Sequence, residues 1–389
     1  GTIAAAGLAA LASACRQAQP PTPQVVERTV VVPQTVAPTV EAVDPLRLPN
    51  AATGVPYTIK PSINDGKPIK LEYWEWAPFR AQYEQRWARE YANIYPNVTI
   101  DVVKTPWDDY WTKLRANIPA KQGPDLYHFH LQSLTEFCSM GFVDPMPEHV
   151  ANQAFLDEHW LGFREGVFSC AGGRGFVPMG AQMPLLLINK VLWEEAGLTE
   201  KDVPKTWDDL RRVARLLTKR DEADRIVQAG FVPDSLIYYV DLIWQQGRFL
   251  FTSDLKHGQF ESEEAYNAIK FIQDLHLIDK VVDVNFPTYD EAFPAGKAAM
   301  IMVESWYVAQ LRRSSPDLSW FAALIPTYTG KLEPTIGRMN FALEAVVNPF
   351  APEDRRQVAW DFWHFAYTSD ERLVHDIAVF NGMLPAYRK

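Results

Sequence analysis

IKLEYWEWAPFRAQYEQRWAREYANIYPNVTIDVV, residues 69–103, decides the fold class of this chain. The stretch opens with an apolar, aromatic run of strand length. It continues as a helix-like segment with apolar positions at Tyr83, Trp87 and Tyr91, and it closes with a β-branched run. A strand, a helix and a strand in this order predict a βαβ unit with a right-handed crossover and parallel strands.

Two later segments carry helix start signals. In KTPWDDYWTKLRANI, Thr105 is expected to be the N-cap, with Pro106 at the first helical position and Asp108 at the third. In PKTWDDLRRVARLLTKR, Thr206 is expected to be the N-cap and Asp209 its capping-box partner. Negative side chains near a helix start complement the exposed amides and the helix dipole, so the adjacent aspartates of both segments are explained without catalysis.

The remaining segments keep the alternation of strands and helices. We expect strands at 183–190, 298–303 and 341–347, and helices at 236–246, at 262–275 and, as a pair, over 353–378. This alternation predicts a mostly parallel sheet in an α/β fold. Because 389 residues exceed what one hydrophobic core usually supports, two lobes are expected.

The composition excludes several classes of function. The net charge of −10 disfavours a nucleic acid as partner, since phosphates require a basic surface. The three cysteines, Cys15, Cys138 and Cys170, match no zinc or redox spacing, and the sequence contains no phosphate-binding loop and no serine nucleophile elbow. We therefore expect no metal and no cofactor.

The N-terminal part predicts export and a lipid anchor. Residues 1–15 are apolar and end in Leu-Ala-Ser-Ala-Cys, which is similar to the lipobox that precedes a lipidated cysteine, here Cys15. An ordinary signal peptide with an incidental cysteine is the alternative. Residues 16–66, rich in Pro, Thr and Val, are expected to be a disordered tether, which favours an anchor because a tether links an anchor to a working domain.

The acidic side chains raise the alternative of a secreted carbohydrate-active enzyme, which needs two carboxylates across a cleft. Strand alternation separates Glu72 from Glu75 and places Glu72 on one face with Trp74 and Trp76. The two glutamates are therefore not an acid pair. Tryptophans that share a face at the end of a strand are expected to form a platform for a ligand.

His128 and His130 are expected on one face of a strand, in the segment PDLYHFHL. Two imidazoles at this spacing can bind a metal if a third ligand arrives from elsewhere. The sequence shows no acidic partner for them, so we expect histidines that are hydrogen-bonded or at the surface.

Read in order, the segments resemble the family 1 extracellular solute-binding proteins of ABC importers, the group that is similar to maltose-binding protein. The resemblance is carried by YWEW with its helix, YPNVTIDVV, DDYWTKL, GPD, MGFVDP, GFVPMGAQMPLLLINKVLWEEAGL, PKTWDDL, FPAGKAAMIMVESW and GMLPAY. These segments keep the family's order from Lys67 to the last residue. The combination of NK, AGL and PKTWDDL with FPAGKAAM is the most specific part.

The resemblance implies a periplasmic-binding-protein-like fold of type II, with two discontinuous α/β lobes, a multi-strand hinge and a ligand cleft between the lobes. We expect lobe 1 to hold 67–178 and 287–348 and lobe 2 to hold 179–286 and 349–389, with crossings near 178–179, 286–287 and 348–349. Chains of this family continue for several helices beyond the Leu-Pro-Ala stretch, so we expect this sequence to be incomplete at both ends.

The resemblance also implies which residues line the cleft. Aromatic rings meet the apolar faces of a sugar, and polar side chains meet its hydroxyl groups. The positions that match the family's cleft are Trp74, Trp76, Phe129, Gln132, Gln182, Asp234, Trp244, Trp306, Arg338 and Asn340. Maltose-type clefts carry charged residues near the positions of Pro78, Phe79, Gln132 and Gln182, which argues against maltose itself.

We expect a monomeric, lipid-anchored binding component of an ABC importer that captures a mono- or oligosaccharide by lobe closure, passes it to a membrane permease and performs no chemistry. Two alternatives stay open: the same fold with a polyamine, a phosphorylated polyol or a peptide as cargo, and the secreted enzyme. Export also permits a disulfide between Cys138 and Cys170, with two buried free thiols as the alternative.

Overall fold

A computed structural model gives the fold of the chain. It describes residues 54–130, 133–160, 177–233, 237–250, 252, 257–331, 340–369, 372, 376 and 382–385. Five residues singled out in the sequence lie outside the described residues: Cys15, Gln132, Cys170, Asp234 and Arg338.

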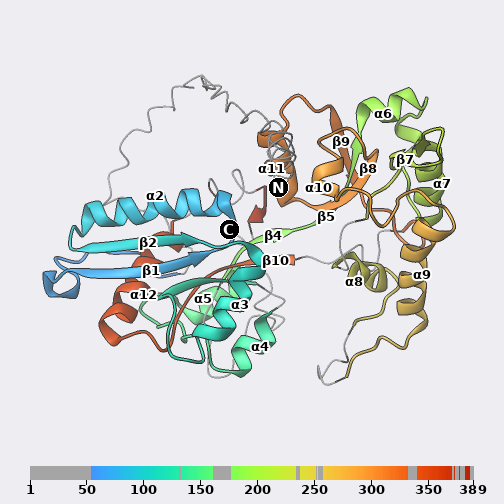
Figure 1. Cartoon of the computed structure of the whole chain (residues 1–389). Coiled ribbons are helices and arrows are strands. Elements are labelled where there is room, and N and C mark those ends of the chain that lie inside the picture. The colour runs from blue at the N-terminus through green and yellow to red at the C-terminus, as the bar shows by residue number, and fades with distance from the viewer. Residues whose placement is uncertain are drawn as a thin grey trace, which may run out of the picture. The chain divides into compact units, whose positions relative to one another are not determined.

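Strands and helices alternate from β1 to α4 and are mixed in the rest of the described chain (Figure 1). The strands are β1 (Ile69–Glu75), β2 (Val98–Lys104), β3 (Leu126–His130), β4 (Pro178–Gln182), β5 (Pro184–Asn189), β6 (Lys219–Arg220), β7 (Ile226–Gln228), β8 (Met300–Glu304), β9 (Trp320–Leu324), β10 (Asn340–Val347) and β11 (Leu384–Pro385). The α-helices are α2 (Pro78–Ile94), α3 (Trp107–Asn117), α4 (Leu134–Ser139), α5 (Gln153–His159), α6 (Lys190–Glu195), α7 (Trp207–Leu217), α8 (Ile237–Trp244), α9 (Glu263–Leu277), α10 (Tyr289–Ala292), α11 (Trp306–Ser314) and α12 (Glu353–Tyr367).

The first sheet has six strands in the order β11-β4-β10-β3-β1-β2. Strand β1 is parallel to β2, with Ile69 opposite Val98, and also parallel to β3, so the predicted βαβ unit is confirmed. Strand β10 is antiparallel to both β3 and β4, and β11 is antiparallel to β4. Only the β3-β1-β2 half of this sheet is therefore parallel.

The second sheet has three strands in the order β8-β5-β9, and both pairs are antiparallel. The expectation of a mostly parallel sheet is wrong here. The prediction failed because the partners of β5 come more than a hundred residues later in the chain, and the local alternation of strand and helix does not specify their direction.

The chain passes between the two sheets at Met183, which is the single residue between β4 and β5. The sequence placed this crossing near 178–179, at the start of β4 rather than at its end. The chain returns between β9 and β10 rather than at 286–287, because β8 and β9 both pair with β5. Helix α12 packs on α2, β1 and β10, so 353–367 belongs to the first core and not, as expected, to lobe 2.

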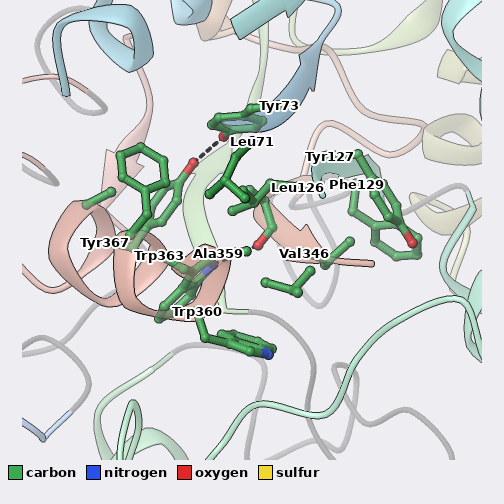
Figure 2. Packing of buried hydrophobic residues seen from close by; sticks show 14 of the residues in the cluster. Leu71, Tyr73, Leu126, Tyr127, Phe129, Val346, Ala359, Trp360, Trp363 and Tyr367 are labelled. Carbon is green, nitrogen blue, oxygen red and sulfur yellow. Dashed lines mark hydrogen bonds between the residues drawn. The ribbon is translucent and has the colours of Figure 1, made fainter. Parts of the chain in front are cut away.

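The first core surrounds the first sheet and includes residues of α2, α3, α4 and α12. Its largest fully buried side chains include Tyr73, Trp87, Tyr127 and Trp363. Helices α2 and α12 meet over the face of β1 from which Tyr73 projects, and the hydroxyl of Tyr73 lies 2.5 Å from that of Tyr367 (Figure 2). A separate core surrounds the second sheet and includes β5, β8 and the apolar face of α7.

Part of the expected tether is packed on the first core. The side chains of Tyr57 and Ile63 are buried. The Tyr57 hydroxyl donates to the Asp361 carboxylate on α12 at 2.9 Å, and His364 lies 2.7 Å from the carbonyl oxygen of Val55. The folded domain therefore begins near residue 55 rather than at the expected residue 67.

The two helix start signals have different outcomes. Thr206 caps α7, since its side chain accepts from the Asp209 backbone and the Asp209 carboxylate accepts from the Thr206 backbone, as predicted. Helix α3 instead has Pro106 as N-cap without a side-chain bond. Thr105 is buried and its backbone N–H donates to the Glu75 carbonyl at 2.8 Å, which continues the strand pairing past the end of β2.

Candidate functional site

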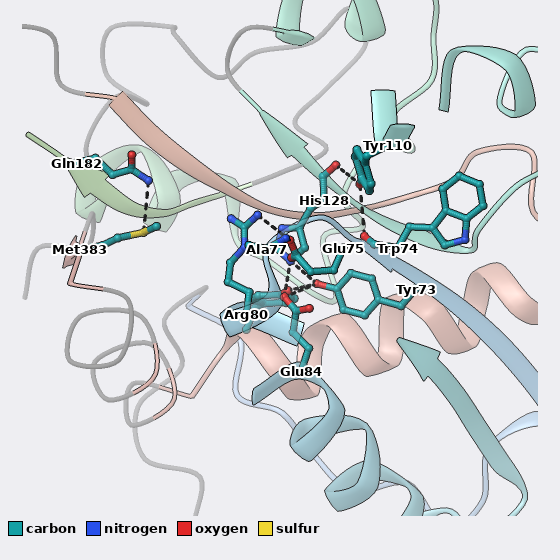
Figure 3. Close-up of polar contacts among 11 residues, drawn as sticks. Tyr73, Trp74, Glu75, Ala77, Arg80, Glu84, Tyr110, His128, Gln182 and Met383 are labelled. Atoms are coloured by element: carbon teal, nitrogen blue, oxygen red, sulfur yellow. Dashed lines mark hydrogen bonds and ion pairs between the residues drawn. The ribbon is translucent and has the colours of Figure 1, made fainter. Parts of the chain in front are cut away.

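Four ionisable side chains meet at the carboxyl end of the parallel strands. Glu75 is the last residue of β1, Arg80 and Glu84 lie in the first two turns of α2, and His128 lies on β3 (Figure 3). None of them is more than 3% exposed. They meet because α2 starts three residues after β1 ends, so its first turns lie beside the ends of β1 and β3.

His128 is at the centre of this buried cluster. Its Nε2 lies 2.7 Å from Glu75 Oε2, bonds Glu84 Oε1 and lies 2.7 Å from the Tyr73 hydroxyl. The other oxygen of Glu75, Oε1, accepts from the Arg80 guanidinium at 2.8 Å. Glu75 therefore joins a permanent cation on one side to a titratable imidazole on the other.

The two glutamates of the cluster have opposite pKa shifts. Burial acts to raise the pKa of Glu75, but the charges of Arg80 and His128 outweigh burial and lower it to about 2. Burial and the neighbouring Glu75 charge raise the pKa of Glu84 to about 7, although His128 opposes them. Burial acts to lower the pKa of His128, yet Glu75 and Glu84 raise it above the ordinary value.

The distances within the cluster fit ion pairs better than a metal site. One ligand atom each from Glu75, Glu84 and His128 lies within 4.8 Å of the others. Ligands of one ion, each bonded at about 2.0–2.2 Å, stand roughly 3 Å or more apart, whereas Glu75 and His128 are 2.7 Å apart. Because this is a hydrogen-bond distance and Arg80 supplies a cation, we interpret the four residues as an ion-pair cluster. The acidic partners of His128, Glu75 and Glu84, were not predicted because they lie on β1 and α2, far from β3 in the sequence.

Trp76 is surrounded by other aromatic rings and lies next to the buried cluster. The guanidinium carbon of Arg80 lies 4.3 Å from the centroid of its ring. Its ring neighbours, at centroid distances of 5.0–6.2 Å, are Trp107, Tyr110, Trp111, His128 and His130.

Trp74 has different neighbours from Trp76. Its indole N–H donates to the carboxylate of Glu72, and in the described part of the chain its ring is not among those that surround Trp76. Strand alternation is confirmed for the glutamates, since Glu75 is fully buried while Glu72 is partly exposed. The common platform of Trp74 and Trp76 stays a prediction.

Trp306 connects the two cores. It is the first residue of α11, directly after β8, and it packs partly buried against both cores. Its ring is nearly parallel to that of Phe79 in the first turn of α2, with centroids 6.5 Å apart and planes 14° apart. The indole N–H of Trp306 donates to the Glu304 carboxylate at 3.2 Å, and the Arg313 guanidinium carbon lies 5.9 Å from the Phe79 centroid.

Two other expected residues lie where the chain crosses between the sheets. Gln182 ends β4, is 7% exposed and has its Nε2 3.9 Å from the sulfur of Met383 (Figure 3). Asn340 begins β10 directly opposite Gln182 in the sheet register.

Two expected site residues lie apart from these groups. Phe129 is fully buried and packs on Phe137 at 5.5 Å, so the expectation that its ring lines a ligand site is wrong. Both faces of β3 are covered, and alternation therefore does not select an exposed side. Trp244 ends α8, and its ring contacts Phe249 at 5.6 Å.

Several residues of this region were missed in the sequence. Their shared signal is position, because each lies in the first two turns of a helix that follows a strand of the parallel half, where α/β folds place their sites. They are Phe79, Arg80 and Glu84 on α2, and Trp107 and Trp111 on α3.

Cys138 lies near the end of α4 and is disulfide-bonded. Cys15 and Cys170, the other cysteines of the chain, both lie outside the described residues. The pairing of Cys138 with Cys170 therefore stays a prediction.

Comparison with known proteins assigns the family. A family model described as bacterial extracellular solute-binding protein matches residues 75–371, more than two thirds of the chain. The chain belongs to the family of bacterial extracellular solute-binding proteins. A protein of Brucella abortus (strain 2308) named as a binding protein is 22% identical to this solute-binding protein over 318 residues, which cover 79% of this chain and 74% of that protein. The maltotriose-binding protein of Pyrococcus abyssi is 21% identical over 309 residues, which cover 79% of this chain and 64% of that protein.

Solved structures share the fold of this solute-binding protein. The maltose/maltodextrin-binding domain MalE from Bdellovibrio bacteriovorus, bound to maltotriose, matches with a TM-score of 0.69 at 16% identity, covering 82% of this chain and 81% of that one. An ABC transporter solute-binding protein from Thermotoga lettingae, bound with alpha-D-tagatose, matches with a TM-score of 0.67 at 22% identity, again covering 82% and 81%. These likenesses confirm the expected two-lobe, type II fold.

Family membership has two consequences. It confirms the expected role, which is to bind a solute without chemistry. It also places the chain in a family of extracellular proteins. Among the described residues, none of the helices has the length and the apolar run that a membrane span requires.

Proposed function

We propose that this solute-binding protein captures a neutral mono- or oligosaccharide and delivers it to the membrane permease of an ABC transporter. The observation that carries the proposal is the pair of nearly parallel rings of Phe79 and Trp306, which lie at the starts of helices that follow a strand of the first sheet and a strand of the second sheet. Aromatic rings bind sugars by covering their apolar C–H faces. Two facing rings therefore offer both faces of one sugar ring a partner.

The spacing of the two rings connects binding to movement. A sugar ring between two aromatic planes needs roughly 3.5–4.0 Å on each side, or about 7–8 Å in all. The centroids of Phe79 and Trp306 are 6.5 Å apart, and the ring planes can be no farther apart than this, so the two rings must part by at least roughly 1 Å to admit a sugar. Capture by lobe movement, as expected from the sequence, is part of the proposal.

The charges near the two rings support a neutral cargo. Glu304 accepts from Trp306 and the Arg313 guanidinium lies over Phe79, so in the described part of the chain a charge of each sign is found beside the pair. A polyamine would be favoured by several carboxylates at the rings, and a phosphorylated polyol by several basic groups. The amide of Gln182, at the crossing between the sheets, is a neutral group that can meet hydroxyl groups.

The sugars named for the similar proteins also support the proposal. One relative is named for maltotriose, and solved structures of this fold hold maltotriose and tagatose. These ligands are neutral carbohydrates of one to three rings. The identities of 16–22% leave the particular sugar of this chain to experiment.

The membrane attachment belongs to the same proposal. Cys15 would carry the lipid, residues between it and the folded domain would act as the tether, and the protein would work as a monomer outside the cytoplasmic membrane. Mass spectrometry of protein made from the full gene tests the anchor. A Cys15 that carries two acyl chains and an added fatty acid supports it, and a cleaved, unmodified N-terminus contradicts it.

Ligand identification tests the carbohydrate proposal directly. Native mass spectrometry of freshly purified protein should show a bound mass equal to one or more hexose or pentose units. A melting-temperature screen with neutral mono-, di- and trisaccharides at millimolar concentration should give stabilisation with at least one of them. Stabilisation by polyamines, sugar phosphates or peptides, with no shift from neutral sugars, would contradict the proposal.

A further inference from the structure

Trp107 is a tryptophan with a large exposed surface at the edge of the sheet where the candidate site lies. It begins α3, three residues after the last residue of β2, and it is 39% exposed. The carboxyl ends of the parallel strands β1, β2 and β3 meet at this edge, which is where α/β folds bind ligands. An indole is costly to leave in water, so its exposure at this edge calls for an explanation.

The exposed ring of Trp107 is held by three other rings. Its centroid lies 5.2 Å from Trp76, 5.2 Å from Trp111 and 5.3 Å from His130, with interplanar angles of 82°, 78° and 87°. Edge-to-face contacts of this kind are the favoured geometry of aromatic pairs. Three of them orient the indole and still leave more than a third of its surface open, so the ring is presented to solvent in a fixed position.

Two residues of the ion-pair cluster, Arg80 and His128, contact the ring of Trp76, which in turn contacts Trp107. Trp111 is nearly buried, and Trp76 has the Arg80 guanidinium over its ring at 4.3 Å. Arg80 is in turn bonded to Glu75, and Glu75 to His128. Burying these charges costs solvation energy, which pairing offsets only when the geometry is good. A rigid support of this kind suits a surface that must hold a ligand ring in place.

We propose that Trp107 is a second ligand-stacking ring, distinct from the Phe79 and Trp306 pair, and that the ligand is an oligosaccharide with at least one sugar ring beyond the one bound by that pair. The proposal rests on the proposed carbohydrate function. Phe79 lies in the first turn of the helix that follows β1, Trp107 begins the helix that follows the neighbouring strand β2, and Trp76, three residues before Phe79, contacts Trp107. The two ring sites therefore lie at the same edge of the sheet.

A matched series of sugars tests this second ring. Isothermal titration with glucose, maltose and maltotriose, and with mannose, mannobiose and mannotriose, gives the affinity gained per added sugar ring. In the wild-type protein the trisaccharide of the preferred series should bind at least ten-fold more tightly than the monosaccharide. Trp107→Ala should weaken the trisaccharide about ten-fold and change the monosaccharide less than two-fold.

Two further variants separate stacking from folding. Trp107→Phe keeps an aromatic ring and should retain most of the trisaccharide affinity, whereas Trp107→Leu keeps apolar volume without a ring and should behave like the alanine variant. Tyr266→Ala, at an aromatic residue that is 62% exposed on α9, is the matched control and should bind as the wild type does.

The outcomes distinguish a failure of the Trp107 role from a failure of the proposed carbohydrate function. Equal losses for mono- and trisaccharide, or an unchanged ratio in both Trp107→Ala and Trp107→Leu, would overturn the role of Trp107 while the carbohydrate function stands. Absence of binding by every neutral sugar in the wild type would overturn both. A wild type that binds a monosaccharide as tightly as its trisaccharide would overturn the oligosaccharide inference alone.

Discussion

The guanidinium carbon of Arg80 lies 4.3 Å from the ring centroid of Trp76, and an Arg80 nitrogen lies 2.8 Å from the Glu75 carboxylate. The same side chain thus contacts the ring of Trp76 and the buried ion pairs. Its side chain is only 4% exposed, so little solvent screens the pair. This relationship makes Arg80 the residue on which both groups depend.

Arg80→Met should strongly destabilise the protein. It removes the cation and leaves the buried Glu75 carboxylate without it, a change that costs roughly 3–5 kcal/mol for buried pairs. Urea denaturation followed by circular dichroism measures the free energy of unfolding. Arg115→Met is the control, because the Arg115–Glu136 pair is about half exposed on the arginine side and should cost only about 0–1 kcal/mol.

The double variant Arg80→Met with Glu75→Gln tests the cause. If the unpaired carboxylate is the main cost, the double variant should be less destabilised than the sum of the two single variants, by roughly 1–3 kcal/mol. Additive losses would show instead that the Arg80 stem acts mainly by packing on Trp76.

Glu84→Gln should flatten the pH dependence of stability. Burial raises the Glu84 pKa from 4.5 in the unfolded chain to about 7, so the folded protein holds more protons between these pH values. The free energy of unfolding therefore falls as pH rises from about 4.5 to about 7, by an amount on the order of a few kcal/mol. His128, whose pKa is raised, adds to this fall above its ordinary value of 6.5.

Chemical denaturation at pH 5, 6, 7 and 8 measures this effect. Glu84→Gln should lose less stability than the wild type between pH 5 and pH 7 and should be the more stable protein at pH 8. The exposed glutamate variant Glu194→Gln should follow the wild-type profile. Parallel profiles of Glu84→Gln and wild type would contradict the assignment of this proton to Glu84.

Features that depend on neighbouring residues were predicted from the sequence, and features that depend on distant strand partners were not. Strand β1, helix α9 and the Thr206 cap were predicted because each depends on residues a few positions apart. The sheet crossings were misplaced because β10 pairs with β3 and β4, which lie more than 150 residues earlier in the chain. No local period of side chains records such a partner.

The candidate site shows the same division. Alternation correctly separated Glu72 from Glu75, which is a property of one strand. It did not reveal that Glu75 meets Glu84 and His128, because that contact needs the turn from β1 into α2 and the pairing of β1 with β3. Phe129 was placed in the cleft by the family resemblance, which does not record that both faces of β3 are covered and that Leu126 to Phe129 are all buried.

Thr206→Ala should destabilise the protein by about 1 kcal/mol, because it removes the side-chain acceptor for the Asp209 N–H at the start of α7. Thr206→Ser keeps the hydroxyl and should cost only a few tenths of a kcal/mol. Thermal and urea unfolding measure both. Equal losses in the two variants would assign the effect to the methyl group of Thr206 rather than to the cap. This methyl group lies beside Gly330.

The rings of Phe79 and Trp306 should contribute to ligand binding as a coupled pair. Each alanine variant removes one of two nearly parallel rings, and fully burying such a side chain is worth roughly 1.5–3 kcal/mol, so each should weaken binding of the preferred sugar about ten- to hundred-fold. Titration calorimetry with the sugar found in the screen measures the loss. Trp306→Phe keeps a ring but loses the indole N–H that donates to Glu304, and it should lie between wild type and alanine.

The double variant decides whether the two rings clamp one sugar ring. If they do, the second ring is worth less once the first is gone, because a ligand without one wall is less well held against the other. The combined loss for Phe79→Ala with Trp306→Ala should then be smaller than the product of the two single losses. Strictly multiplicative losses would place the two rings on separate parts of the ligand, and unchanged affinity in the Phe79 variant would return that ring to packing between the two cores.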